Sequence, residues 1–85
     1  MITKKIAVGI SEGLEARPVA MLVQMASQYE SSIYIEDESR KVNAKSIMGM
    51  MALGLGSGAN VQLTVSGEDE EKAAAAIEKY LVSKS

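Results

Sequence analysis

The sequence contains no histidine and no cysteine among its 85 residues, and each absence excludes a class of chemistry. Without histidine the chain has no imidazole base, no Ser-His-Asp triad and no residue that could become phosphohistidine. Without cysteine it has no thiolate nucleophile, no disulfide and no thiolate zinc site. A small chain that lacks both residues fits a reducing compartment.

Aromatic residues and positive charge are also scarce. The only aromatic residues are three tyrosines, and the net charge is −2. Direct nucleic-acid binding favours a basic stripe and rings that stack on bases, so it is not expected here. No apolar run approaches the ~20 residues of a membrane-spanning helix, and the N-terminus lacks the apolar stretch of a signal peptide. We therefore expect a cytoplasmic protein that does not bind membranes.

The residues that are present predict one globular domain over 1–85. A hydrophobic share of 47% is ordinary for such a domain. Apolar residues alternate in some segments and recur every three or four residues in others, which predicts strands and helices respectively. The predicted order is strand, helix, strand, strand, helix, strand, helix, over residues 2–10, 16 to about 29, 32–36, 40–43, 47 to about 53, 61–65 and from 69 onward.

This order of elements indicates an α+β domain. It is a split βαβ arrangement with a trailing helix, which favours a four-stranded antiparallel sheet covered by helices on one face. Asp69 is a good N-cap for the last helix, and acidic residues follow it where the helix dipole favours them. The buried stripe of that helix is predicted to consist of Ala73, Ala74, Ile77 and Leu81.

The first candidate site lies at the start of the first predicted helix. Glu15 and Arg17 place a carboxylate and a guanidinium where unpaired backbone N–H groups point outward. A helix N-terminus beside an arginine can bind an anion. The alternative is structural: the negative charge of Glu15 interacts favourably with the helix dipole, and Arg17 is solvated.

The second candidate site surrounds Ser46, which falls where the short helix should begin. One interpretation is that the hydroxyl only caps the helix. The other is phosphorylation, because the helix dipole and Lys45 would both favour the added negative charge. A helix this short cannot bury its whole circumference, so Ile47, Met48 and Met51 are expected to face outward in part and to suit an adaptable binding surface. The alternative is that all three belong to the core.

Two other patterns carry no function. The glycines at 54, 56 and 58 follow a predicted helix and precede a strand, the reverse of a nucleotide-binding loop. The acidic runs at 36–38 and 68–71 fall at a turn and at a helix start, where solvated carboxylates are common. We expect neither a metal ion nor a cofactor.

Two motifs make the whole chain resemble the HPr family of phosphocarrier proteins. They are Gly-Leu-Glu-Ala-Arg-Pro at 13–18 and Asn-Ala-Lys-Ser-Ile-Met-Gly at 43–49. The resemblance implies an HPr-like open-faced β-sandwich with three helices on one face. It also implies that position 15 should be the histidine that accepts phosphate from phosphorylated enzyme I. Here Glu15 occupies that position, so the usual relay cannot run through this chain.

The regulatory half of the family pattern is retained. In HPr proteins of low-GC Gram-positive bacteria, the serine that matches Ser46 is phosphorylated by HPr kinase/phosphorylase. The phosphoprotein then binds CcpA, a LacI-family repressor, in carbon catabolite repression. The Crh variants keep this serine and lack the histidine, and this chain resembles them. The resemblance places Glu15, Arg17 and Lys45 beside Ser46, Ile47, Met48 and Met51 in the interface with partners.

The sequence thus predicts a non-enzymatic regulatory phosphoprotein. One alternative is a carrier of the phosphoenolpyruvate-dependent sugar phosphotransferase system that uses an unorthodox acceptor. Another is a protein-interaction domain that is modified at neither site. A further hypothesis is that the negative charge of Glu15 mimics a phosphorylated position 15. A monomer or a weak homodimer is expected, because unpaired sheet edges allow strand exchange.

Overall fold

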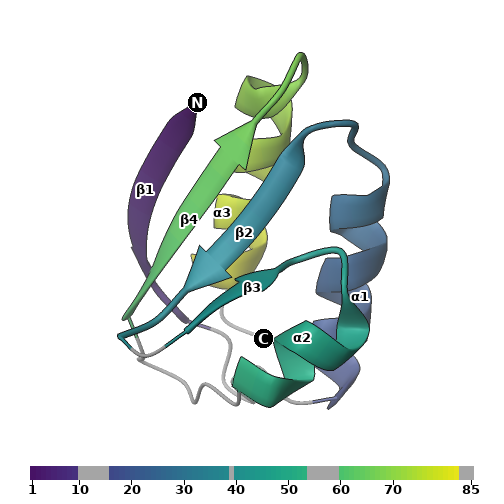
Figure 1. Ribbon diagram of the computed structural model, residues 1–85, viewed down its shortest axis with the longest axis vertical. Coiled ribbons are helices and arrows are strands. Elements are labelled where there is room, and N and C mark those ends of the chain that lie inside the picture. The colour runs from purple at the N-terminus through teal and green to yellow at the C-terminus, as the bar shows by residue number, and fades with distance from the viewer. Residues whose placement is uncertain (10–15, 39, 54–59, 83–85) are drawn as a thin grey trace.

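The computed structural model describes residues 1–9, 16–38, 40–53 and 60–82, and its elements follow the predicted order. The glycine run, Glu15 and Lys84 lie outside these residues. The elements of the described residues are β1 (Ile2–Ala7), α1 (Ala16–Ser27), β2 (Ser32–Glu36), β3 (Lys41–Asn43), α2 (Ile47–Leu53), β4 (Asn60–Ser66) and α3 (Glu70–Val82). Figure 1 shows how they are arranged.

The four strands form one antiparallel sheet in the order β1-β4-β2-β3, so β4 inserts between two strands that precede it in the chain. Helix α3 packs against β1 and β4, while α2 lies beside β3 and against α1 (Figure 1). The predicted α+β class, an open four-stranded antiparallel sheet with three helices, is confirmed.

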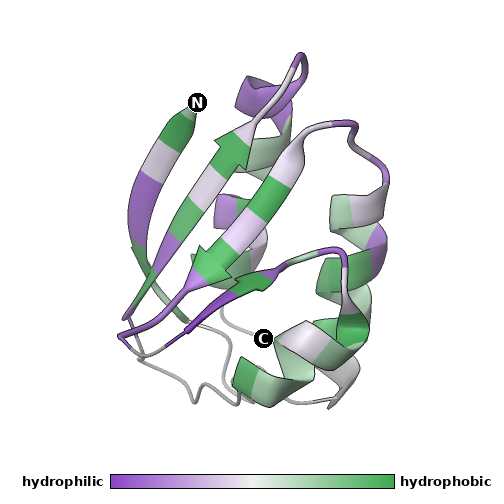
Figure 2. Ribbon diagram, in the orientation of Figure 1, coloured by the Kyte–Doolittle hydropathy of each residue, from purple (hydrophilic) through white to green (hydrophobic). Residues whose placement is uncertain are grey.

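The core lies between the sheet and the helices. Successive side chains of a strand point to opposite faces of the sheet. Along β2 and β4, hydrophobic residues that point into the core alternate with more hydrophilic residues that point away from it (Figure 2). The stripe predicted for α3 is buried as expected. The residues of β2 and β4 that point away from the core are half-buried or exposed. The largest fully buried apolar side chains are Leu22, Ile33, Ile35, Met50, Leu63, Ile77 and Leu81.

The first predicted strand was too long. Strand β1 ends at Ala7 rather than at residue 10, because the chain leaves the sheet and approaches α3. The N–H of Gly9 donates to the carbonyl oxygen of Leu81 over 2.7 Å. Val8 remains buried although it is no longer paired in the sheet. Hydrophobic alternation therefore continues past the point where strand pairing stops.

Other boundaries differ from the predictions by one or two residues: β4 extends one residue further at each end, α3 begins at Glu70, and α1 and β3 also differ. Helix α1 ends at Ser27, and the next turn tightens through a bond of 3.2 Å from the N–H of Tyr29 to the carbonyl of Ala26. The return strand β3 begins at Lys41, not at residue 40, because Arg40 closes the preceding turn. Its N–H donates to the side chain of Asp37 over 2.9 Å.

Within the described ranges, no helix is long and apolar enough to cross a membrane. In the same part of the chain, no three acidic side chains come together in a group that could hold a metal ion.

Candidate functional site

The predicted start of α2 at Ser46 is confirmed in detail. The N–H of Gly49 donates to the Ser46 hydroxyl oxygen over 3.2 Å, and the N–H of Met50 donates to the Ser46 carbonyl over 3.0 Å. Ser46 is thus the N-cap, with its side chain bonded to the third helical residue. The preceding turn is held by Asn43, whose carbonyl accepts the Ser46 N–H and whose side chain accepts the Lys45 N–H. Local backbone geometry therefore fixes the position of the hydroxyl.

Gly49 leaves room beside this hydroxyl. A Cβ atom at that position would lie 3.4 Å from the Ser46 oxygen and 3.6 Å from the Val42 side chain. Those are ordinary van der Waals distances for the unmodified serine. Ser46 is half-buried, and position 49 places no side chain over its hydroxyl.

Three apolar side chains next to Ser46 face outward. Ile47 is 45% exposed, Met51 51% and Met48 80%, and we call these three residues the α2 surface. Met50 and Leu53, on the other side of the helix, are buried in the core. The alternative that Ile47, Met48 and Met51 all belong to the core is therefore wrong. The structure places an apolar surface directly beside a serine hydroxyl.

Lys45 has a structural contact that the sequence did not predict. Its ammonium group donates to the carbonyl oxygen of Tyr29 over 2.7 Å, just beyond the end of α1. A cation just beyond the C-terminal end of a helix interacts favourably with the helix dipole. Lys45 therefore ties the end of α1 to the start of α2, and its contact with a partner remains a prediction.

The first candidate site is described only in part. Arg17 lies in the first turn of α1, which begins at Ala16, so the predicted helix start is confirmed. Pro18 falls in the same turn, where its missing N–H has no helical partner to lose. Glu15, the residue at the family's acceptor position, lies outside the described residues.

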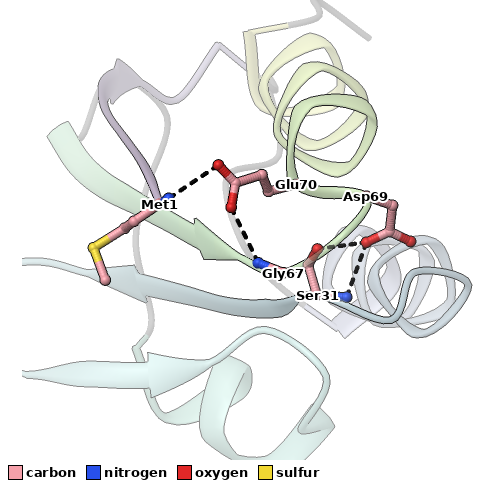
Figure 3. Close-up of polar contacts among 5 residues, drawn as sticks. All are labelled: Met1, Ser31, Gly67, Asp69 and Glu70. Atoms are coloured by element: carbon pink, nitrogen blue, oxygen red, sulfur yellow. Dashed lines mark hydrogen bonds and ion pairs between the residues drawn. The ribbon is translucent and has the colours of Figure 1, made fainter.

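A second polar cluster lies at the start of α3, and Figure 3 shows its side chains. The carboxylate of Asp69 accepts hydrogen bonds from the N–H of Glu30 over 2.9 Å and of Ser31 over 3.0 Å, and from the Ser31 hydroxyl. The carboxylate of Glu70 accepts the N–H of Gly67 over 3.1 Å and the N-terminal ammonium of Met1 over 3.0 Å. We call Met1, Ser31, Gly67, Asp69 and Glu70 the α3 cluster.

These contacts lower the pKa values of both carboxyl groups. The Ser31 hydroxyl is the largest cause for Asp69, followed by the N–H of Glu30. The bond from the N-terminal ammonium is the largest cause for Glu70, followed by the N–H of Gly67. Hydrogen bonds and a positive charge favour the ionised form. The α3 cluster therefore has a structural role, and its hydrogen bonds and ion pair depend on ionised carboxylates.

Sequence reasoning found Asp69 but assigned its side chain only a local role. Its backbone carbonyl does accept the N–H of Ala73 over 2.9 Å, as an N-cap residue should. Its carboxylate, however, bonds to Ser31, which is 38 residues away in the chain. No local pattern could have identified that partner, because it is brought there by the pairing of β2 with β4.

Comparison with known proteins identifies the class to which this domain belongs. A family model described as "PTS HPr component phosphorylation site" matches residues 2–83, and the chain belongs to the HPr family of phosphocarrier proteins. The HPr-like protein Crh of Halalkalibacterium halodurans is 44% identical over 81 residues, which cover 95% of this chain and 96% of that protein.

Solved structures agree with this assignment. The crystal structure of the phosphocarrier protein HPr from Bacillus anthracis superposes with a TM-score of 0.92 at 41% identity, covering 94% of this chain and 95% of the other. The crystal structure of Crh from Bacillus subtilis, described as a dimer with a swapped domain, gives a TM-score of 0.76 at 42% identity. It covers 95% of this chain and 93% of the other. The predicted resemblance to the HPr family, with Crh among its relatives, is confirmed.

Proposed function

We propose that this protein is a Crh-like regulatory phosphoprotein that HPr kinase/phosphorylase phosphorylates on Ser46. The phosphorylated form acts as a corepressor by binding a CcpA-type repressor of the LacI family in carbon catabolite repression. The observation that carries the proposal is the position of the Ser46 hydroxyl at the start of α2, beside the exposed α2 surface. The absence of histidine from the chain argues against the family's usual phosphate relay.

A phosphate on Ser46 would suit the electrostatics of this position. It would add about −1.5 to −2 charges at the end of α2 where backbone N–H groups converge. Its oxygens could accept the hydrogen bonds that the hydroxyl oxygen now accepts from Gly49. Because the hydroxyl is only half-buried, the modification requires no unfolding of the core. Phosphorylation would therefore change the surface and leave the fold intact.

The α2 surface would supply the apolar part of the interface. Binding energy in protein complexes concentrates in well-packed anchors, while charged groups around them determine specificity. Ile47, Met48 and Met51 are exposed apolar side chains that a partner could cover. The methionine side chains are flexible and can adapt to the partner's shape. Phosphoserine 46 and Arg17 would provide the charges around them.

Intact-mass measurement after incubation with ATP and HPr kinase/phosphorylase tests the modification. The native chain should gain one phosphate, and Ser46→Ala should gain none. Ser66→Ala is a matched control, because Ser66 is an exposed serine at the end of β4 and does not cap a helix. It should be phosphorylated as the native chain is. Phosphate on Ser46→Ala would contradict the assignment of the site.

Binding to the repressor tests the second half of the proposal. The phosphorylated native chain should bind a purified CcpA-type repressor, whereas the unphosphorylated chain and Ser46→Ala should bind at least tenfold more weakly. Equal binding by all three would support an unmodified interaction domain instead. Unchanged binding by a phosphorylated Glu15→Gln variant would remove the hypothesis that Glu15 mimics a phosphate.

The carrier alternative has a distinct signature. It predicts transfer of labelled phosphate from phosphoenolpyruvate through enzyme I to the chain, with loss of the label in Glu15→Ala. Such a product would be an acyl phosphate: a carboxylate oxygen attacks the phosphorus atom, the bond between the phosphoryl group and enzyme I breaks, and unphosphorylated enzyme I leaves. Label on the native chain but not on Glu15→Ala would favour the carrier over the regulatory role.

A further inference from the structure

We propose that Met48 and Met51 are oxidation sites, and that their conversion to methionine sulfoxide by a peroxide weakens partner binding at the α2 surface. The effect on the partner rests on the proposed function, whereas the selectivity of the oxidation rests on the structure alone. The modification would couple the proposed switch at Ser46 to the presence of oxidants.

Exposure distinguishes these methionines from a neighbour on the same helix. Met48 is 80% and Met51 51% exposed, whereas Met50 between them is completely buried. A peroxide must collide with the sulfur atom, so reactivity follows exposure. The chain has six methionines and no cysteine, and the thioethers are therefore its most readily oxidised groups. Helix α2 thus presents two reactive thioethers, and the buried Met50 on the same helix serves as an unreactive control.

The oxidation is balanced by the peroxide alone. The sulfur of Met48 or Met51 attacks one peroxide oxygen, the O–O bond breaks, and an S=O bond forms. The sulfur loses two electrons, and hydrogen peroxide is reduced to water. Methionine sulfoxide reductases reverse the change: two thiols reduce the sulfoxide, forming a disulfide and water. The modification is consequently reversible without any change to the backbone.

The expected effect on binding follows from the change in polarity. The thioether is apolar, and it contributes to an interface by leaving water. The sulfoxide oxygen is a strong hydrogen-bond acceptor, so burying it without a donor is unfavourable. Met48 is two residues from Ser46, so the new polar group would lie in the interface that includes the proposed phosphate. Oxidation should therefore oppose the effect of phosphorylation.

Peptide mass spectrometry after graded exposure to hydrogen peroxide tests the selectivity. Among the three methionines of α2, sulfoxide should accumulate on Met48 first and on Met51 next, and at least tenfold more slowly on Met50. Equal rates at Met50 and Met48 would overturn the structural basis of the proposal. Circular dichroism on the same samples should show the folded spectrum throughout, which would establish that oxidation does not unfold the domain.

The repressor-binding assay, repeated on the oxidised phosphoprotein, tests the consequence. We expect Kd to rise at least tenfold and to recover after treatment with methionine sulfoxide reductases. In the Met48→Leu/Met51→Leu variant, Kd before and after peroxide should agree within twofold, although its remaining exposed methionines still react. Met21→Leu is the matched control: Met21 is 53% exposed but lies on α1, and this variant should keep the full sensitivity.

The outcomes separate the two proposals. If the unoxidised phosphoprotein binds the repressor and full conversion of Met48 and Met51 leaves Kd unchanged, the present proposal is overturned and the proposed function stands. If the unoxidised phosphoprotein does not bind, the proposed function fails and the regulatory part of this proposal fails with it. The relative oxidation rates of Met48 and Met50 still decide the assignment of the oxidation sites.

Discussion

The starts of α2 and α3 use polar side chains in different ways. At α2, Ser46 bonds to Gly49, which lies three residues ahead in the same helix. At α3, Asp69 bonds to Glu30 and Ser31, which precede it by 39 and 38 residues. The first arrangement holds only its own helix, whereas the second joins a helix to the beginning of a strand. The hydrogen bonds at the start of α2 are therefore local in the sequence, whereas those at the start of α3 are long-range.

Because of this difference, the start of α2 lies beside an exposed surface, whereas the start of α3 is part of the structural framework. Around Ser46 the apolar side chains of the α2 surface remain exposed, and no other segment among the described residues covers them. Around Asp69 the chain closes on itself, and Ser31 is the buried polar residue in the described part of the core. A locally held segment can change its chemistry without loosening the fold, which suits a modification site. A chemical change in the α3 cluster would instead break contacts between distant parts of the chain.

Replacing the glycine of each region should give the largest contrast. Gly67 has a φ of +153°, and a Cβ there would lie 2.6 Å from the Ser31 Cα atom. Gly67→Ala combines an unfavourable backbone conformation with a clash against backbone, and should lower the free energy of unfolding by about 2–4 kcal/mol. Urea denaturation monitored by circular dichroism measures this loss.

The matched substitution at α2 should have the opposite sign. Gly49→Ala meets only ordinary van der Waals contacts. It removes a glycine from a helix and should raise the free energy of unfolding by about 0.5–1 kcal/mol. A similar loss in both variants would contradict the distinction between the two regions.

Acidification should weaken the α3 cluster before the α2 cap. The pKa of Asp69 is lowered by its bonds to Ser31 and Glu30, so folding favours the ionised carboxylate. The stabilisation is complete above the usual aspartate pKa of about 4. It is lost as the pH falls through the lower pKa of the folded state.

Thermal denaturation between neutral pH and pH 2 measures this dependence. Asp69→Ala should lower Tm by several degrees at neutral pH, because three donors lose their acceptor. It should also reduce the further fall in Tm on acidification. An acid dependence identical to that of the native chain would mean that Asp69 is not the group responsible.

Removing the Ser46 hydroxyl should have a smaller effect. Ser46→Ala removes the acceptor of the Gly49 N–H and should lower the free energy of unfolding by about 1 kcal/mol. Ser46→Asp, which keeps a capping oxygen, should recover most of that loss. Chemical denaturation of the two variants at neutral pH makes the comparison. Equal stability of Ser46→Ala and the native chain would indicate that the cap contributes nothing measurable.

The smallest effect is expected for the ion pair with the N-terminus. Met1 is largely exposed, and exposed ion pairs contribute little. Glu70→Gln should lower Tm by no more than a few degrees, since an amide oxygen can still accept the Gly67 N–H. The difference from the native chain should shrink in high salt, because salt screens exposed charges. A difference that grows with salt would contradict an electrostatic origin.

Much of the fold and of the Ser46 site was predictable from the sequence. Val61, Leu63 and Val65 alternate with polar residues and are buried in β4, as predicted. The exposure of Met48 and Met51 also followed from the shortness of α2. The endpoint of β1 was not predictable, because the approach of Gly9 to Leu81 depends on where α3 lies.

The sequence by itself determined the type and order of the elements and the cap at Ser46. These features depend on spacings of two to four residues, which the geometry of strands and helices translates directly into faces and hydrogen bonds. Only the tertiary structure decided that β4 lies between β1 and β2, that Asp69 bonds to Ser31, and that Lys45 bonds to Tyr29. Such partners meet because the chain folds back around one core, and no local spacing specifies which distant residue arrives there.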